Sequence, residues 1–411
     1  LILTLILGKN MRSMESLIIV GSCGLIGLGT ISVELMIYSF LDIPWKPLYL
    51  MIPYLVLLLF AIRLKRLQPI QLRAQKSFYS LLILIAASLG INGWILGNPV
   101  YAWDGWAIWN FRAQVFYYYG HLEKTFFLSP LIQFSHMDYP LLVPLSQTWI
   151  YVHLGSVNTG YSQLIYIIAY FSLIAISLGF FRQQTKNPWV YWLATALIGL
   201  MPWVIENMQT NYVDIIVSVY LFSALATLML SFFLKNTYYA VIGWIMFGLC
   251  AFTKNEGLYI YIIATIFFII YSAFNRELLK KTWLVFVISW LPLVLWKAYT
   301  ALNHISGANM FSNLNIHFAL THFSRILVIL GAFCNVHSGG FWGLTWPIFF
   351  LTLIFFIIKK SSILPYYFYI LILLVLYLTI YYFTPYDLAW HIETSLDRLI
   401  LQLTPSAALV T

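Results

Sequence analysis

Long uncharged stretches divide this chain into a series of apolar runs, most of them near the ~20 residues that cross a bilayer as a helix. Such runs favour helices, because backbone groups inside lipid need partners within their own segment. They also lack the polar and apolar alternation of a β-barrel. The runs lie near residues 16–40, 48–62, 78–96, 161–181, 189–205, 212–234, 237–253, 257–274, 283–300, 341–358 and 363–383, with another beginning near Leu399.

Composition supports lipid as the main solvent of the chain. Only 9% of the residues are charged and 62% are apolar, a balance that a water-exposed globular surface does not tolerate. The run at 16–40 is too long for a signal-peptide core and is expected to remain in the mature protein. We therefore predict an all-α polytopic membrane protein of about 11–13 transmembrane helices, forming a single domain over residues 1–411.

Neither the ends of the sequence nor its cysteines indicate a particular function. The sequence starts on Leu1 instead of Met and stops at Thr411 inside a fresh apolar run, so we expect residues to be missing at both ends. Cys23, Cys250 and Cys334 lie far apart without CxxC spacing, which indicates core thiols instead of a disulfide framework or a metal site.

Basic residues predict the orientation of the helices. The net charge of +9 comes from Lys and Arg placed between apolar runs, which indicates a topology signal and not a nucleic-acid surface. With a cytoplasmic N-terminus, the inner connections hold Lys9, Arg12, Arg63, Lys65, Arg66, Arg73, Lys76, Arg182, Lys186, Lys235, Arg276, Lys280, Lys281, Lys359 and Lys360. The acids then gather at the opposite, outer face.

This orientation requires two apolar stretches to lie in the outer interface without crossing, residues 140–155 and 323–335. An extra crossing at either place is the alternative, and it would invert everything that follows. The large outer loop is then 97–160. Its part from Trp103 to Tyr119 has helical spacing, which predicts an amphipathic helix on the membrane surface.

Asp104 is the candidate catalytic residue of this loop. A carboxylate held at the lipid boundary can accept a proton from an attacking hydroxyl. Asp104 also stands at the start of the expected helix, where a carboxylate serves equally well as a cap. The neighbouring Trp and Tyr residues fit an interfacial aromatic belt.

Further polar residues lie at other outer helix ends. The candidates for substrate binding are His136, Asp138, Tyr139, Asp214, Lys254, Glu256, Asp397 and Arg398. A solvated turn explains Lys254 and Glu256 as well, and a satisfied ion pair explains Asp397 and Arg398. His136 with Asp138 indicates a metal only if more ligands join them, so we predict no metal residues and leave a divalent cation open.

Outer cations need anionic partners, and a phosphate group would supply them. The outer Lys and Arg residues are Lys46, Arg112, Lys124, Lys254, Lys297, Arg325 and Arg398. Arg112, Lys254 and Arg398 stand nearest to the acidic clusters, and we expect these three to clamp a phosphate or pyrophosphate.

Five motifs together resemble a known family: WDGWAIWNFRA at 103–113, HMDYPLLVP at 136–144, NYVD at 211–214, TKNEG at 253–257 and TPYDLAWHIETSLDRLILQL at 384–403. They look like polytopic glycosyltransferases of the C superfamily, closest to the aminoarabinose and protein O-mannosyl transferases of glycosyltransferase family 39. The resemblance spans about residues 97–405 and depends on motif order.

The resemblance implies transfer of a sugar, with inversion, from a polyprenyl-phosphate donor to a lipid, glycan or protein acceptor of the cell envelope. It implies Asp104 as the base and Lys254 as a phosphate contact, at the outer face of a bacterial cytoplasmic membrane. Two departures stand out. The acidic loop follows the third run instead of the first, and Asp138 precedes Tyr139 and Pro140 where relatives often carry a lysine.

Other classes of function stay open at this point. A transporter or flippase of lipid-linked sugars is one, although transporters place ionisable groups near the bilayer midplane, and here Glu34 is the one acid well inside a run. A polysaccharide ligase or polymerase is another. Partners are expected to be membrane lipids and no nucleic acid.

Overall fold

The computed structural model describes residues 2–64, 66, 90–98, 100, 102–274, 276–307, 312–338 and 344–411. Within these residues the chain is helical and contains no strands, as the apolar runs predict. The elements are α1 (Ile2–Leu7), η1 (Gly8–Ser13), α2 (Ser16–Phe40), α3 (Pro47–Arg63), η2 (Asp104–Asn110), α5 (Phe111–Tyr119), α6 (Lys124–Leu128), η3 (Pro130–Ser135), α7 (Leu142–Leu154), α8 (Thr159–Ser162), α9 (Leu164–Gln184), α10 (Pro188–Gly199), α11 (Pro202–Thr210), α12 (Asp214–Phe233), α13 (Thr237–Ala251), α14 (Asn255–Phe274), α15 (Arg276–Ser289), α16 (Leu291–Leu302), α17 (Ile316–Thr321), α18 (Ser324–Ser338), α19 (Thr345–Ile358), α20 (Leu364–Phe383) and α21 (Leu388–Val410).

Five helical segments among the described residues are long and apolar enough to cross a membrane: Ser16–Phe40, Thr159–Gln184, Asp214–Phe233, Lys280–Leu302 and Leu364–Phe383. A sixth crossing results if α10 and α11, bent by 45° at their junction, count as one span. The break precedes Pro202, and a proline disfavours helical backbone in the residue before it. Other expected runs form shorter apolar helices, and most of the run 78–96 lies outside the described residues. The higher count of 11–13 stays a prediction.

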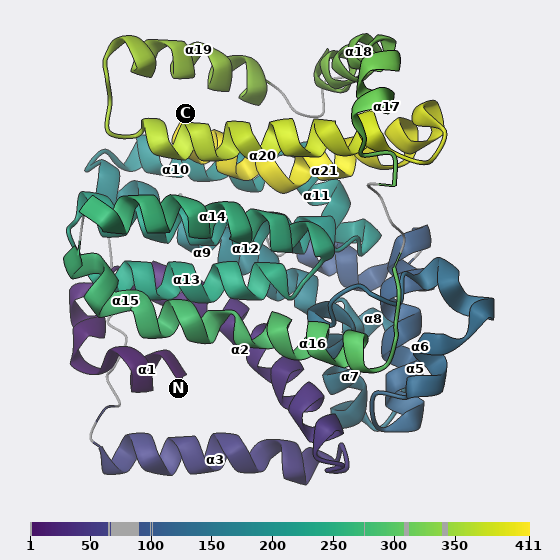
Figure 1. Ribbon diagram of the computed structural model, residues 1–411. Coiled ribbons are helices and arrows are strands. Elements are labelled where there is room, and N and C mark those ends of the chain that lie inside the picture. Colours follow the sequence, from purple (N-terminus) through teal and green to yellow (C-terminus); the bar gives the residue numbers. More distant parts are fainter. Residues whose placement is uncertain are drawn as a thin grey trace.

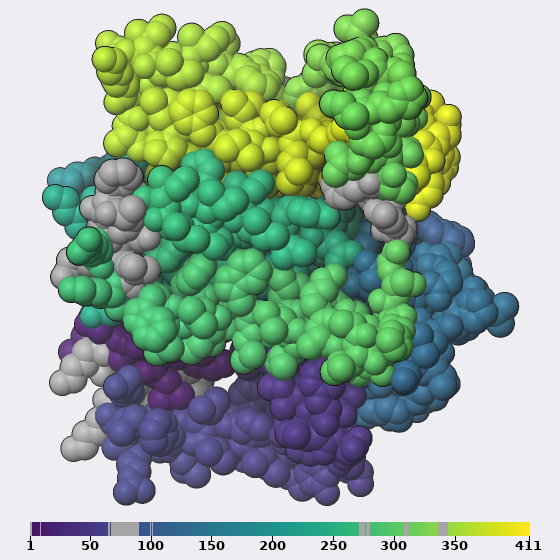
Figure 2. All heavy atoms as spheres, in the orientation of Figure 1, coloured from purple at the N-terminus to yellow at the C-terminus, as the bar shows by residue number. Residues whose placement is uncertain are grey.

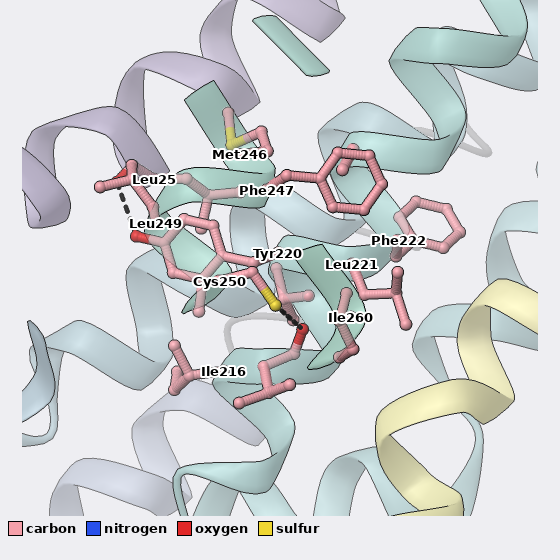
Figure 3. Close-up of a cluster of buried hydrophobic side chains, with 14 of the residues drawn as sticks. Leu25, Ile216, Tyr220, Leu221, Phe222, Met246, Phe247, Leu249, Cys250 and Ile260 are labelled. Atoms are coloured by element: carbon pink, nitrogen blue, oxygen red, sulfur yellow. Dashed lines mark hydrogen bonds between the residues drawn. The ribbon is translucent and has the colours of Figure 1, made fainter. Parts of the chain in front are cut away.

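Helix α12 lies at the centre of the bundle, packed against α9, α13 and α21. Almost all of its side chains are buried. Figure 3 shows part of this core, where aromatic and aliphatic side chains of α12 and α13 meet residues of α2 and α14. Tyr220 donates a hydrogen bond to the carbonyl of Leu25 at 2.8 Å, and the thiol of Cys250 donates to the carbonyl of Val217 at 3.7 Å. These bonds give polar core groups partners inside the bundle.

The outer layer of the molecule is apolar on its exposed side as well. Helix α3 forms a separate ridge along the lower edge of Figure 2, and Leu55 and Leu59 on it are 51% and 66% exposed. Apolar side chains facing outward along a whole helix are what lipid contact requires. In Figure 1 the helices α13, α14 and α20 run side by side across the view, while α5, α6, α7 and α16 gather at one end of them.

The stretch 140–155, expected at the interface, forms α7, which packs against α2 and α5 with most of its side chains buried. The stretch 323–335 forms most of α18, which packs against α20 and α21. The helical spacing from Trp103 to Tyr119 becomes η2 followed by α5. All three segments are therefore helical, as the sequence predicts.

Candidate functional site

A cavity of about 780 Å³ lies where η2, the segment 134–139, the first turns of α12 and α14, and parts of α16, α20 and α21 meet. Four acidic and three basic side chains line it, contributed by segments that are far apart in the sequence. The charged groups are Asp104, Asp138, Asp214, Glu256, Lys254, Lys297 and Arg398. A charged cavity with aromatic walls is suited to a polar ligand carrying an anionic group.

Close backbone packing brings Asp104 to this cavity. A Cβ on the next residue, Gly105, would lie 2.4 Å from the carbonyl oxygen of Thr210, so only glycine allows η2 to approach the segment that leads into α12. Asp104 accepts a charge-assisted hydrogen bond from Arg398 at its Oδ2 atom. Its Oδ1 atom has no hydrogen-bond partner among the described residues, and the side chain is 22% exposed.

Lys254 lies in the turn between α13 and α14 and binds two carboxylates. Its Nζ atom is 2.8 Å from Asp214 Oδ1 and 3.0 Å from Glu256 Oε1. The turn is tight, because a Cβ on Gly257 would lie 2.0 Å from the carbonyl oxygen of Cys250. Burial lowers the pKa of Lys254, but the two carboxylates outweigh burial and hold that pKa above its usual value. The ammonium group is therefore charged across the physiological range.

Arg398 on α21 lies between the carboxylates of Asp104 and Asp214. Its Nη1 atom, bonded to Asp104, also lies 4.0 Å from Asp214 Oδ2. The guanidinium carbon sits 4.5 Å from the centre of the Tyr212 ring, in a cation–π arrangement. Its Nη2 atom donates to the carbonyl of Thr394 at 2.7 Å, which fixes the side chain along its own helix. Four groups thus hold this cation in one orientation.

Behind Asp214, a chain of hydrogen bonds runs into the bundle core. Gln402 of α21 donates to Asp214 Oδ1 at 2.6 Å, and Tyr377 of α20 donates to Gln402 Oε1 at 2.6 Å. All three side chains are buried. The first residue of α12 is therefore tied to both C-terminal helices, and polar atoms with no access to water are satisfied.

The segment 136–139 forms another part of the cavity wall. The ring of Tyr139 stacks against Trp109 and His136, with 5.6 Å and 4.8 Å between ring centres. Lys254 lies 5.9 Å from the centre of the Tyr139 ring. Burial lowers the pKa of His136, so its imidazole is neutral near pH 7.

Arg112 lies behind this segment and not in the cavity. It is completely buried, and its guanidinium donates to the backbone carbonyls of Tyr139 at 3.1 Å and His136 at 3.5 Å. Burial lowers the pKa of Arg112 to about 10, although the nearby Asp138 carboxylate favours the charged form. Arg112 still carries its charge at neutral pH. Its contacts are those of a residue that positions the 136–139 segment.

Asp138 and Lys297 are joined through an amide. Asn255 donates to Asp138 Oδ2 at 2.6 Å and accepts from Lys297 Nζ at 3.1 Å. Trp296 donates to the backbone carbonyl of Asp138 at 3.0 Å, which anchors α16 to the same segment. Gly307 leaves room for the Asp138 carboxylate, since a Cβ there would lie 2.2 Å from its carboxyl carbon.

Eight of the ten predicted site residues line the cavity, and Arg112 and Asp397 do not. Asp397 bonds the backbone amide of Arg398 at 2.7 Å instead. The cavity is also lined by Asn255, Lys297, Trp390 and His391, for which the sequence predicts no role. Lys297 is one of the outer cations, but no neighbouring acidic residue or motif in its apolar run marks it as a site residue.

Within the described part of the chain, no group of three or more His, Cys, Asp or Glu residues is arranged to hold a metal ion. His136 and Asp138 gain no further ligand there. Comparison of the chain with family models, with curated proteins and with solved structures found no match.

Proposed function

We propose that the protein is a membrane glycosyltransferase that moves a sugar from a polyprenyl-phosphate donor to a hydroxyl of an envelope acceptor, with inversion at the sugar. In this proposal the chain has the 11–13 spans and the C-superfamily architecture predicted from sequence. The cavity opens to the extracytoplasmic side of a bacterial cytoplasmic membrane.

The observation that carries the proposal is one cavity that collects acidic and basic side chains from distant stretches of an apolar chain. A lipid-linked sugar phosphate needs both a cation for its phosphate and a carboxylate near the reacting hydroxyl. The exposed aromatic residues Trp103 and Trp390 line the same cavity, and aromatic faces suit a sugar ring or a lipid chain.

Asp104 is the proposed base. Its Oδ2 atom is held by Arg398, while Oδ1 is uncommitted and accepts the proton of the acceptor hydroxyl. The hydroxyl oxygen forms a bond to the anomeric carbon, and the bond from that carbon to the phosphate oxygen breaks. The electron pair leaves on the polyprenyl phosphate, whose added charge is offset by basic side chains of the cavity. Phosphate is a good leaving group, so no general acid is required.

The test is transfer of radiolabelled sugar from polyprenyl phosphate by the full chain in lipid vesicles. Asp104→Asn keeps the shape of the side chain and removes the proton acceptor, so transfer is expected to fall roughly 10²-fold or more. Asp42→Asn is the matched control, because Asp42 is exposed and does not line the cavity.

Substantial turnover by Asp104→Asn would remove this residue from its role. Movement of the labelled lipid-linked sugar across the vesicle membrane, without transfer by the unmodified chain, would favour the transporter or flippase. Transfer that requires a pyrophosphate-linked glycan would favour the ligase or polymerase.

A further inference from the structure

Two of the three basic side chains in the cavity are already neutralised by acids. Lys254 binds Asp214 and Glu256, while Arg398 binds Asp104 and lies 4.0 Å from Asp214. The three carboxylates around these two cations give this end of the cavity a net negative charge. A phosphate placed against Lys254 or Arg398 would meet those carboxylates at short range, and like charges repel most strongly where water is excluded.

Lys297 is in a different electrostatic position. Its Nζ atom donates one hydrogen bond, to the neutral amide oxygen of Asn255 at 3.1 Å. The amide nitrogen of Asn255 engages Asp138, so the amide stands between that carboxylate and the ammonium group. Within the described ranges Lys297 forms no ion pair, and its one hydrogen bond leaves two of its three N–H donors uncommitted.

The helix that carries Lys297 is firmly placed. The preceding residue, Trp296, is completely buried, and its indole N–H donates to the Asp138 carbonyl. The Trp296 ring also packs against Phe127 at 5.6 Å and stacks on Tyr299 at 5.7 Å between ring centres. These contacts fix the backbone from which the lysine side chain starts, and Lys297 lines the cavity.

We propose that Lys297 receives the phosphodiester group of the lipid-linked donor, while Lys254 and Arg398 hold the cavity carboxylates Asp104, Asp214 and Glu256 in place. This inference rests on the proposed function and assigns its phosphate-binding end. Lys254 is the residue that the motif TKNEG favours for phosphate contact, so the charge pairing reverses the assignment drawn from sequence. The sugar then lies between Lys297 and Asp104.

The experiment measures Kd of the full chain in lipid nanodiscs for a polyprenyl monophosphate without sugar, by intrinsic tryptophan fluorescence. Lys297→Met removes the charge and keeps the length of the side chain, and the loss of one charge-assisted hydrogen bond weakens binding roughly 10- to 100-fold. Lys297→Arg keeps Kd within a few fold. Lys124→Met is the matched control, since Lys124 is exposed and lies outside the cavity.

Two further ligands separate the sources of binding. Uncharged polyprenol is expected to bind Lys297→Met as it binds the unmodified chain, which shows that the variant is folded. Inorganic phosphate is expected to compete only weakly. If it competes as well as the lipid phosphate, the lipid-specific assignment is overturned.

An unchanged Kd for Lys297→Met would overturn the inference. If sugar transfer proceeds and Lys297→Met leaves KM for the donor unaltered, the inference fails and the transferase stands. If Lys297 is needed for lipid-phosphate binding but no sugar donor is used, the phosphate site stands and the transferase fails.

Discussion

Asp214 offers the sharpest test of the ion-pair arrangement. Its side chain is 2% exposed and accepts bonds from Lys254 at 2.8 Å and Gln402 at 2.6 Å. Asp214→Asn keeps the volume and removes the charge. Lys254 retains Glu256 at 3.0 Å, so its ammonium group is not left alone.

Removing one partner of a buried ion pair costs about 3–5 kcal/mol in free energy of unfolding. Because Glu256 remains, we place Asp214→Asn at about 3 kcal/mol, the low end of that range. Lys254→Met leaves two carboxylates without their shared cation and is expected at about 5 kcal/mol. The double variant should lose less than the sum, with a coupling energy of about 2 kcal/mol or more.

The assay is denaturant titration of the detergent-solubilised chain, with Asp42→Asn as the exposed control. Three results together support the pairing: both single losses, their order, and the coupling. Additive losses, or a loss below about 1 kcal/mol for Asp214→Asn, would refute it, since such values belong to solvated surface pairs.

Two further predictions concern packing and pH. Gly257→Ala places a Cβ 2.0 Å from the backbone of Cys250 and should lower the free energy of unfolding by about 3 kcal/mol or more. Gly27→Ala, in open space on α2, should not lower it. Equal effects of the two substitutions in the same titration would contradict the close turn. Burial, with a smaller effect of Arg398, lowers the pKa of His391 to about 4, below the value near 6.5 of an unfolded chain. As the pH falls, the unfolded chain binds this proton before the folded chain does. The contribution of neutral His391 to the free energy of unfolding is therefore fully present above about pH 6.5, and about 3 kcal/mol of it is lost by pH 4. His391→Gln should remove that part of the slope, and an unaltered pH profile would exclude it.

Helical character and the gathering of charge at one place were both predictable. Long apolar runs leave the backbone no other solution in lipid, and each run ends where polar residues begin. Asp214 begins α12 and Lys254 lies in the turn between α13 and α14, so their convergence follows from these three helices lying side by side. Arg398 lies in the middle of α21 and reaches the same place along its helix. The bend before Pro202 was also predictable, because proline disfavours helical backbone in the residue before it.

The contacts that individual side chains form with one another were not predictable from the sequence. Arg112 has the spacing of a residue on a surface helix, yet it bonds carbonyls 24 and 27 positions away and is completely buried. Lys297 lies in an otherwise apolar stretch, and Asn255 bonds both its ammonium group and the Asp138 carboxylate. Such contacts depend on which helices meet in space, and local periodicity carries no information about that.

The bond between Asp104 and Arg398 joins residues 294 positions apart. During synthesis the loop bearing Asp104 leaves the ribosome long before the helix bearing Arg398, so the early helices must enter the membrane while the carboxylate still lacks its cation. Assembly of the cavity is thus a late event in the biogenesis of the chain. A nascent chain halted before α21 would lack Arg398 and Gln402, the partners of Asp104 and Asp214.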